Sequence, residues 1–118
     1  MSDTSPYECL EEMARATMHL VPDEDHFVLA AFDFEVDPVA ISLDVAPFRP
    51  GQLDDPSLFR RVEAPADLQE RLSALGVAFR ATAASRAAAD SRPSVTQALT
   101  LRVFADGTFS FGTTSRDR

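Results

Sequence analysis

Two strand-like runs rich in apolar residues, separated by a turn that contains proline, constrain the fold of this chain more than any other feature. Residues 26–34 (HFVLAAFDF) and 39–48 (VAISLDVAPF) have the composition and periodicity of strands. Pro38 lies between them and cannot adopt the positive φ of a tight two-residue turn, which favours a four-residue loop at 35–38. The two runs therefore predict an antiparallel hairpin.

A hairpin with this loop has one apolar face and one acidic face. Its register predicts three apolar pairs across the strands: Phe34 with Ile41, Phe32 with Leu43, and Ala30 with Val45. The opposite face carries the polar side chains Asp33, Glu35, Ser42 and Asp44. One side of the hairpin is thus suited to a core, and the other to solvent or to a partner.

Two further segments have the apolar spacing of amphipathic helices. The first runs from a capping box at residues 5–8 (SPYE) to Pro22. The second begins near Pro65 and has apolar residues at helical spacing: Leu68, Leu72, Leu75 and Phe79. Gly76 lowers the intrinsic helix propensity of this segment by about 1 kcal/mol relative to Ala. The Ala-rich residues 81–92 either extend the second helix or form a linker.

A second hairpin is predicted near the end of the chain. A three-residue loop at 105–107, with Gly107 in the left-handed conformation, fits the sequence better than a two-residue turn. The resulting register pairs Val103 with Phe109 and Leu101 with Phe111, and it places Leu99 on the same apolar face. We expect residues 113–118 to form a mobile tail.

Together these elements predict an α+β domain in which helices pack on an antiparallel sheet. The expected order is helix-strand-strand-helix-strand-strand, and residues 57–62 fit either a helical turn or a short extra strand near 58–62. A chain of 118 residues is long enough for one hydrophobic core and too short for two. We therefore expect a single domain over residues 1–118, with residues 1–4 mobile as well.

The net charge of the chain indicates which classes of partner it can bind. The formal net charge is −8, and all 11 basic residues are arginine. Residues 1–67 hold 15 acidic residues and 4 arginines, whereas residues 68–118 hold 4 acidic residues and 7 arginines. A strongly acidic protein repels nucleic acid and anionic membranes, so we expect neither as a partner. Such a charge favours a protein partner with a basic surface.

Motifs that carry chemistry are weak in this sequence. The consecutive residues 23–26 (DEDH) cannot converge on one metal ion unless the loop curls around it, so a solvated turn is the better interpretation. Asp33, Glu35 and Asp37 alternate along a strand about 6.5–7 Å apart, which is too far for one ion, although a two-metal site or a pair of arginines from a partner could span them. We expect no catalysis, no metal and no cofactor. With no apolar run of about 18 residues and no signal sequence, we expect a cytoplasmic protein.

The acidic residues of the loops and of the strand face are the candidate contact surface for a basic partner, with an ordinary solvated face as the alternative. Like charges repeated along one strand raise one another's pKa and lower the stability of the fold, which favours a binding role for these residues. The candidates are Asp23, Glu24, Asp25, Asp33, Glu35, Asp37, Asp44, Asp54 and Asp55. The sequence does not indicate an oligomeric state.

The phrase MHLVPDEDHFVLAAFDF, the ending LTLRVFADGTFSFGT and the order of elements resemble small bacterial immunity proteins of the YezG type. The last hairpin of that family carries an Asp-Gly-(Lys/Thr)-Phe turn, which here is Asp106-Gly107-Thr108-Phe109. The resemblance implies an α+β domain that neutralises a co-encoded toxin by direct binding, without chemistry.

Two alternatives stay open. Size, acidity and the helix followed by a hairpin are also similar to type III secretion chaperones, which are homodimers whose apolar grooves bind an extended effector segment. A metal-dependent enzyme that uses the acidic strand face is the other alternative. Binding through charge weakens as salt is added, binding in an apolar groove varies little with salt, and a metal-dependent activity is abolished by EDTA.

Overall fold

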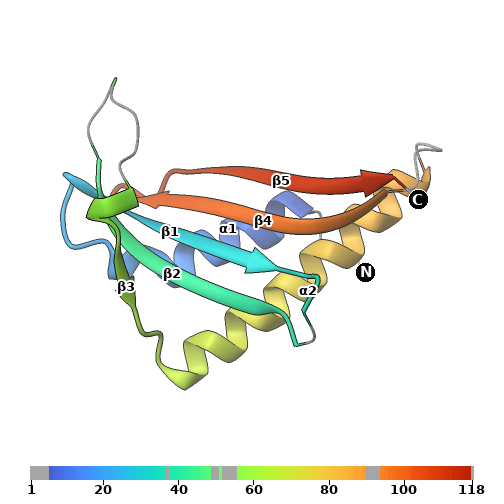
Figure 1. Cartoon of the computed structure of the whole chain (residues 1–118), viewed down its shortest axis with the longest axis horizontal. Coiled ribbons are helices and arrows are strands. Elements are labelled where there is room, and N and C mark those ends of the chain that lie inside the picture. The colour runs from blue at the N-terminus through green and yellow to red at the C-terminus, as the bar shows by residue number, and fades with distance from the viewer. Residues whose placement is uncertain (1–5, 37, 49–50, 52–55, 90–93, 118) are drawn as a thin grey trace.

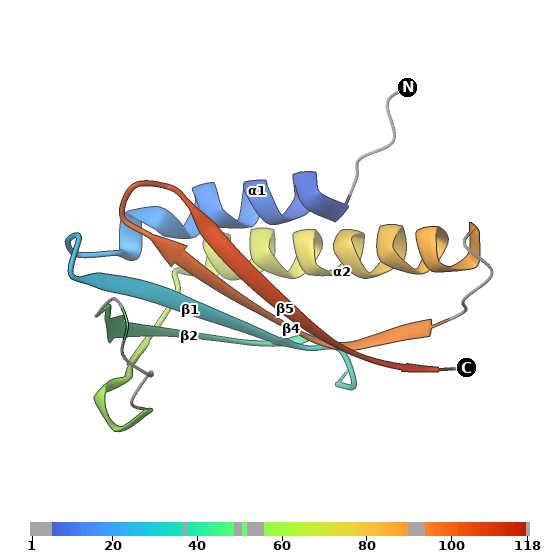
Figure 2. The same ribbon diagram turned by 90° about the horizontal axis from the view of Figure 1, so that it is seen from above.

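The computed structural model describes residues 6–36, 38–48, 51, 56–89 and 94–117. Within these residues, two α-helices lie on one face of a five-stranded antiparallel sheet (Figures 1 and 2). The elements in chain order are α1 (Pro6–Thr17), the 3-10 helix η1 (Met18–Leu20), β1 (His26–Asp33), β2 (Ala40–Pro47), the 3-10 helix η2 (Pro56–Leu58), β3 (Arg60–Val62), α2 (Ala66–Ala89), β4 (Ser94–Phe104) and β5 (Phe109–Asp117). The predicted α+β class is confirmed. The predicted order is incomplete, because residues 57–62 contribute to both η2 and β3.

Strand β1 lies at the centre of the sheet, whose strand order is β3-β2-β1-β4-β5. It pairs with β2 on one side and with β4 on the other, so strands from the two ends of the sequence become neighbours. The composition of β1 suits this position, because the buried residues Phe27, Val28, Ala30 and Phe32 place apolar side chains on both faces of the sheet.

The predicted register of the first hairpin is wrong by two residues. The observed pairs are Val28 with Val45, Ala30 with Leu43, and Phe32 with Ile41. The turn begins earlier than predicted, because the Asp33 carboxylate accepts a hydrogen bond from the Glu35 N–H (3.0 Å) and ends β1 before Phe34. A shift of two residues leaves each side chain on its predicted face, so the apolar face still forms the core.

The second hairpin has the predicted register and the predicted loop. Its pairs include Val103 with Phe109 and Leu101 with Phe111. The Phe104 N–H donates to the Thr108 carbonyl (2.9 Å), and Gly107 has a φ of +87°, so residues 105–107 form the three-residue loop. Residues 113–117, expected to belong to a mobile tail, continue β5. Residues 1–4 and 118 lie outside the described residues.

The core lies between the helices and the sheet. Its largest buried side chains come from both helices, β1 and β4: Leu10, Met13, Leu72, Phe32, Leu99 and Leu101. Gly76 lets α2 approach the sheet closely, since a Cβ at this position would lie 3.0 Å from Cδ2 of Phe32 and 3.5 Å from Cε1 of Phe34. Close packing therefore explains a residue of low helix propensity in the middle of α2.

Helix α2 continues through the Ala-rich segment as far as Ala89, and residues 90–92 lie outside the described residues. Of the two options left open by the sequence, the helical one holds for residues 81–89. Neither this helix nor any other in the described ranges is long and apolar enough to cross a membrane.

Candidate functional site

The face of the sheet opposite α1 and α2 carries no α-helix in the described part of the chain (Figure 2). Short side chains on three adjacent strands make part of this open face hollow, and they line a shallow groove: Ala31, Ala40, Ser42, Ala98 and Thr100. Asp33 and Glu35 also line the groove, together with Arg61 of β3. The open face is therefore less acidic than the first hairpin alone indicates.

Three of the predicted contact residues lie at this open face: Asp33 and Glu35, which line the groove, and Asp44 of β2. Asp44 forms an ion pair with Arg61, whose Nε lies 3.0 Å from Oδ1 of the carboxylate. On β4, Arg102 places its guanidinium over the Phe27 ring at 5.7 Å from the centroid. Arginines from β3 and β4 thus accompany the carboxylates of β1 and β2, a pairing that the sequence of the first hairpin could not indicate.

The predicted contact residues that the structure describes are not all in one place. Asp23, Glu24 and Asp25 precede β1, whereas Asp33 and Glu35 lie at its far end. Eight residues of extended strand separate these groups by roughly 23–26 Å. The other predicted residues, Asp37, Asp54 and Asp55, lie outside the described residues.

The loop before β1 is an ordered turn built on Asp23. Its Oδ1 accepts a hydrogen bond from the Asp25 N–H (2.9 Å) and lies 2.6 Å from Nδ1 of His26. The hydrogen bond with His26 is the main cause that lowers the pKa of the Asp23 carboxyl below its ordinary value, and the Asp25 N–H acts in the same direction. Asp23 therefore keeps its negative charge into mildly acidic solution.

A fourth carboxylate, that of Asp106 in the β4–β5 turn, lies beside this loop. Pairing of β4 with β1 places the turn and the loop at the same end of the sheet (Figures 1 and 2), where Glu24 and Asp106 line one pocket. The Thr108 hydroxyl and N–H both donate to Oδ1 of Asp106, at 2.6 and 3.0 Å. Of these, the hydroxyl contributes most to lowering the pKa of the Asp106 carboxyl. We call Asp23, Glu24, Asp25 and Asp106 the acidic end.

Sequence reasoning assigned Asp106 only to a turn, because its proximity to residues 23–25 depends on the β1–β4 pairing. That pairing brings Phe27 opposite Phe104. The available signal was the apolar content of the two strands, which have 8 and 11 residues, and this signal does not specify which strands pair.

Aromatic rings lie beside the acidic end. Phe104 contacts Phe48 and Phe27, with ring centroids 5.0 and 5.9 Å apart, and Phe59 lies 6.3 Å from Phe27. Phe48 is 38% exposed. Its ring and that of Phe104 form the apolar part of a pocket that we call the aromatic pocket: Glu24, Phe48, Phe104, Ala105, Asp106 and Thr108.

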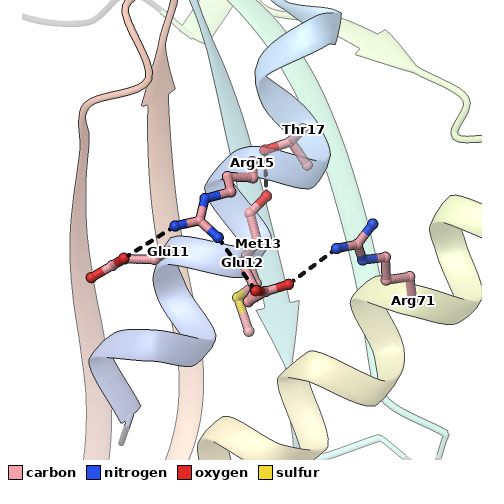
Figure 3. A network of polar contacts seen from close by, with 6 residues as sticks. All are labelled: Glu11, Glu12, Met13, Arg15, Thr17 and Arg71. Carbon is pink, nitrogen blue, oxygen red and sulfur yellow. Dashed lines mark hydrogen bonds and ion pairs between the residues drawn. The ribbon is translucent and has the colours of Figure 1, made fainter. Parts of the chain in front are cut away.

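Glu11 and Glu12 of α1 differ from the acidic end because arginines pair with them. Glu12 lies 3.5 Å from Arg15 and 3.0 Å from Arg71 of α2, and Arg15 also lies 3.6 Å from Glu11 (Figure 3). Among the described residues, no ion pair involves Glu24, Asp25 or Asp106. Asp23 forms an ion pair only with His26. The acidic end therefore concentrates negative charge that no described arginine balances.

Metal-binding and nucleophilic groups are not gathered in the described ranges. No three His, Cys, Asp or Glu side chains there are placed to hold a metal ion. Cys9 is buried in α1, and burial, followed by the charge of Glu8, raises the pKa of its thiol. These observations add no support to the metal-dependent enzyme.

Comparison with known proteins leaves the family open. No protein-family model matches the chain. No curated protein matches it either. The resemblance to YezG-type immunity proteins therefore stays a prediction, and the acidic end with its pocket is the feature from which a function is inferred.

Proposed function

We propose that the protein is an immunity protein, which binds and neutralises a bacterial toxin by contact and without catalysis. The observation that supports this proposal most is the acidic end. Two turns about 80 residues apart in sequence bring Glu24 and Asp106 to one pocket, and no described arginine pairs with either. An unbalanced cluster of this kind is suited to a basic partner.

The physical basis of neutralisation is charge complementarity. Toxins that act on nucleic acids or nucleotides present basic clefts to phosphate groups, and carboxylates can occupy such clefts in place of the substrate. Attraction between the opposite charges raises the association rate, by about 10- to 1,000-fold in favourable cases. The net charge of −8 acts in the same direction. A fast encounter matters for a toxin that must be captured before it acts.

The test is capture of the toxin from the native host, followed by kinetics and growth rescue with two matched triple variants. The first variant neutralises the acidic end with Glu24→Gln, Asp25→Asn and Asp106→Asn. The control removes three exposed carboxylates around the start of α2 with Glu63→Gln, Asp67→Asn and Glu70→Gln. We expect the first variant to associate about tenfold more slowly at low salt, with a flatter salt dependence, and to lose growth rescue.

The control variant has the same net charge as the first and should stay close to the wild type. Equal slowing in both variants would mean that overall charge, and not the acidic end, governs association. A captured partner without toxic activity would contradict the immunity proposal itself.

The chaperone is the second candidate, and the groove on the open face favours it. An extended effector segment would lie over the short side chains of β1, β2 and β4. Binding there should persist at high salt and should be blocked by Ala98→Arg, which fills the groove. The triple variant of the acidic end should then bind as the wild type does.

A further inference from the structure

We propose that the aromatic pocket binds the side chain of an arginine that the partner protein supplies. The guanidinium would lie against the rings of Phe48 and Phe104, with the carboxylates of Glu24 and Asp106 beside it. This inference rests on the proposed function, because it names the residue by which a basic partner is anchored.

The pocket combines the two kinds of group that attract a guanidinium. Aromatic faces carry negative charge density and bind cations within about 6 Å of the ring centroid. Carboxylates accept hydrogen bonds from the N–H groups of arginine. Both hydrogen bonds from Thr108 end on Oδ1 of Asp106, an exposed residue that lines the pocket, so they leave its Oδ2 for a ligand.

The same aromatic cluster already holds a guanidinium at its other end. Arg102 lies over Phe27, with 5.7 Å between its Cζ atom and the ring centroid. Phe104 contacts both Phe27 and Phe48, so the cluster is continuous from the Phe27 ring beneath Arg102 to the exposed ring of Phe48. Arg102 covers the buried ring of Phe27, whereas Phe48 at the open end of the cluster is 38% exposed. A second arginine at the open end would repeat an interaction that the molecule itself contains.

Arginine fits the pocket better than lysine. Its planar guanidinium can stack on a ring while its edge donates hydrogen bonds in two directions, toward carboxylates on separate turns. Lysine offers a compact, strongly hydrated charge that cannot stack in this way. The chemistry therefore indicates a guanidinium and not merely a cation.

Hydrogen bonds and packing hold the walls of the pocket in place before a ligand arrives. The Phe48 N–H donates to the Asp25 carbonyl at 2.7 Å, which ties β2 to the loop before β1. On the other wall, Thr108 fixes Asp106 through its hydroxyl. Gly107 in the same turn packs near Met18, whose Cε and Sδ would lie 3.7 and 4.0 Å from a Cβ added to the glycine. Little conformational entropy is then lost when the pocket is filled.

The test is an NMR titration of the full chain with N-acetyl-arginine amide, and with the citrulline and lysine analogues as controls. The citrulline compound has nearly the same shape without charge. We expect arginine to shift the amide signals of Glu24, Phe48, Ala105 and Thr108, with a dissociation constant on the order of 1–10 mM. Equal shifts with citrulline or lysine, or shifts spread equally over Asp67 and Glu70, would overturn the assignment.

Two variants separate the contribution of the Phe48 ring to arginine binding from that of the overall negative charge. Phe48→Leu keeps every carboxylate and should weaken arginine binding about two- to fivefold, because the cation–π contact is lost. Tyr7→Leu removes an exposed aromatic ring beside the acidic residues of α1 and should leave arginine binding unchanged. Equal affinity of the Phe48→Leu variant and the wild type would exclude the aromatic pocket as the binding site.

The arginine test and the immunity test can fail separately. Arginine binding in the pocket without any toxin partner would contradict the immunity function and leave the pocket assignment intact. A neutralised toxin whose affinity does not change with Phe48→Leu would support the immunity function and overturn the arginine anchor.

Discussion

At the scale of single residues, Gly76 shows how a weak local preference can serve tertiary packing. By helix propensity alone, Gly76→Ala should stabilise α2 by about 1 kcal/mol. The Cβ, however, would lie 3.0 Å from the ring of Phe32, which is buried and stacked on Phe34 with 6.2 Å between the centroids. The ring has little freedom to move away.

We therefore predict that Gly76→Ala lowers the free energy of unfolding by up to about 2 kcal/mol, because overpacking costs about 1–3 kcal/mol and exceeds the gain of about 1 kcal/mol in helix propensity. Urea unfolding monitored by circular dichroism would measure the change. Val77→Ala at the next, exposed position is the control and should stay within about 0.5 kcal/mol of the wild type. If Gly76→Ala stabilised the protein, the Phe32 ring would have to move aside without a large cost, which would contradict this prediction.

At the scale of elements, the two hairpins differ in how far their sequences specify them. The β4–β5 loop contains a glycine with positive φ and an aspartate that accepts hydrogen bonds from Thr108, so its register could be predicted from the residues alone. The first hairpin offered only Pro38 and a run of acidic residues. Its register depends on where Asp33 ends β1 and on Phe34, whose N–H donates to Gln97 of β4. Gln97 is 63 residues from Phe34 in the sequence, so no local sequence pattern could predict this hydrogen bond.

The Asp106 turn gives a prediction about pH. Its folded pKa is lowered, so its contribution to stability is present above the unfolded pKa of about 3.9 and is lost as pH falls through the folded pKa. The difference in unfolding free energy between the wild type and Asp106→Asn should therefore be largest near neutral pH and vanish in acid. Thermal unfolding from pH 7 to pH 2 would measure it. Thr108→Val removes the hydroxyl donor and should reduce this difference, whereas a difference that grows in acid would contradict the assigned cause.

At the scale of the whole molecule, composition anticipated the sign of the charge but not its placement. On the strand face, Asp44 pairs with Arg61. On α1, Glu12 pairs with Arg15 and Arg71. Among the carboxylates that no described arginine pairs with, Glu24 and Asp106 come together where the loop before β1 meets the β4–β5 turn. A hairpin considered alone cannot show this, because the neutralising arginines come from β3 and α2 and the additional carboxylate from the last turn.

A net charge of −8 also predicts how salt affects stability. Repulsion among the carboxylates opposes the compact state, and added ions screen it. Raising sodium chloride from 0.02 to 0.3 M should therefore raise the melting temperature at pH 8, and less so at pH 4.5, where fewer carboxylates are charged. Differential scanning calorimetry would measure both. A melting temperature that falls with salt would mean that the exposed ion pairs outweigh the repulsion.

The central position of β1 has a consequence for the order of events during synthesis. One of its neighbours, β2, follows within a few residues, but the other, β4, emerges from the ribosome some 70 residues later. Until then one edge of β1 has no strand beside it, and Glu24 lacks the turn that completes its pocket. The acidic end is thus assembled last, so a chain released before β4 and β5 would have most of the acidic residues without the pocket that Glu24 and Asp106 line. Under the proposed function, only a chain translated through the C-terminal hairpin can engage the partner.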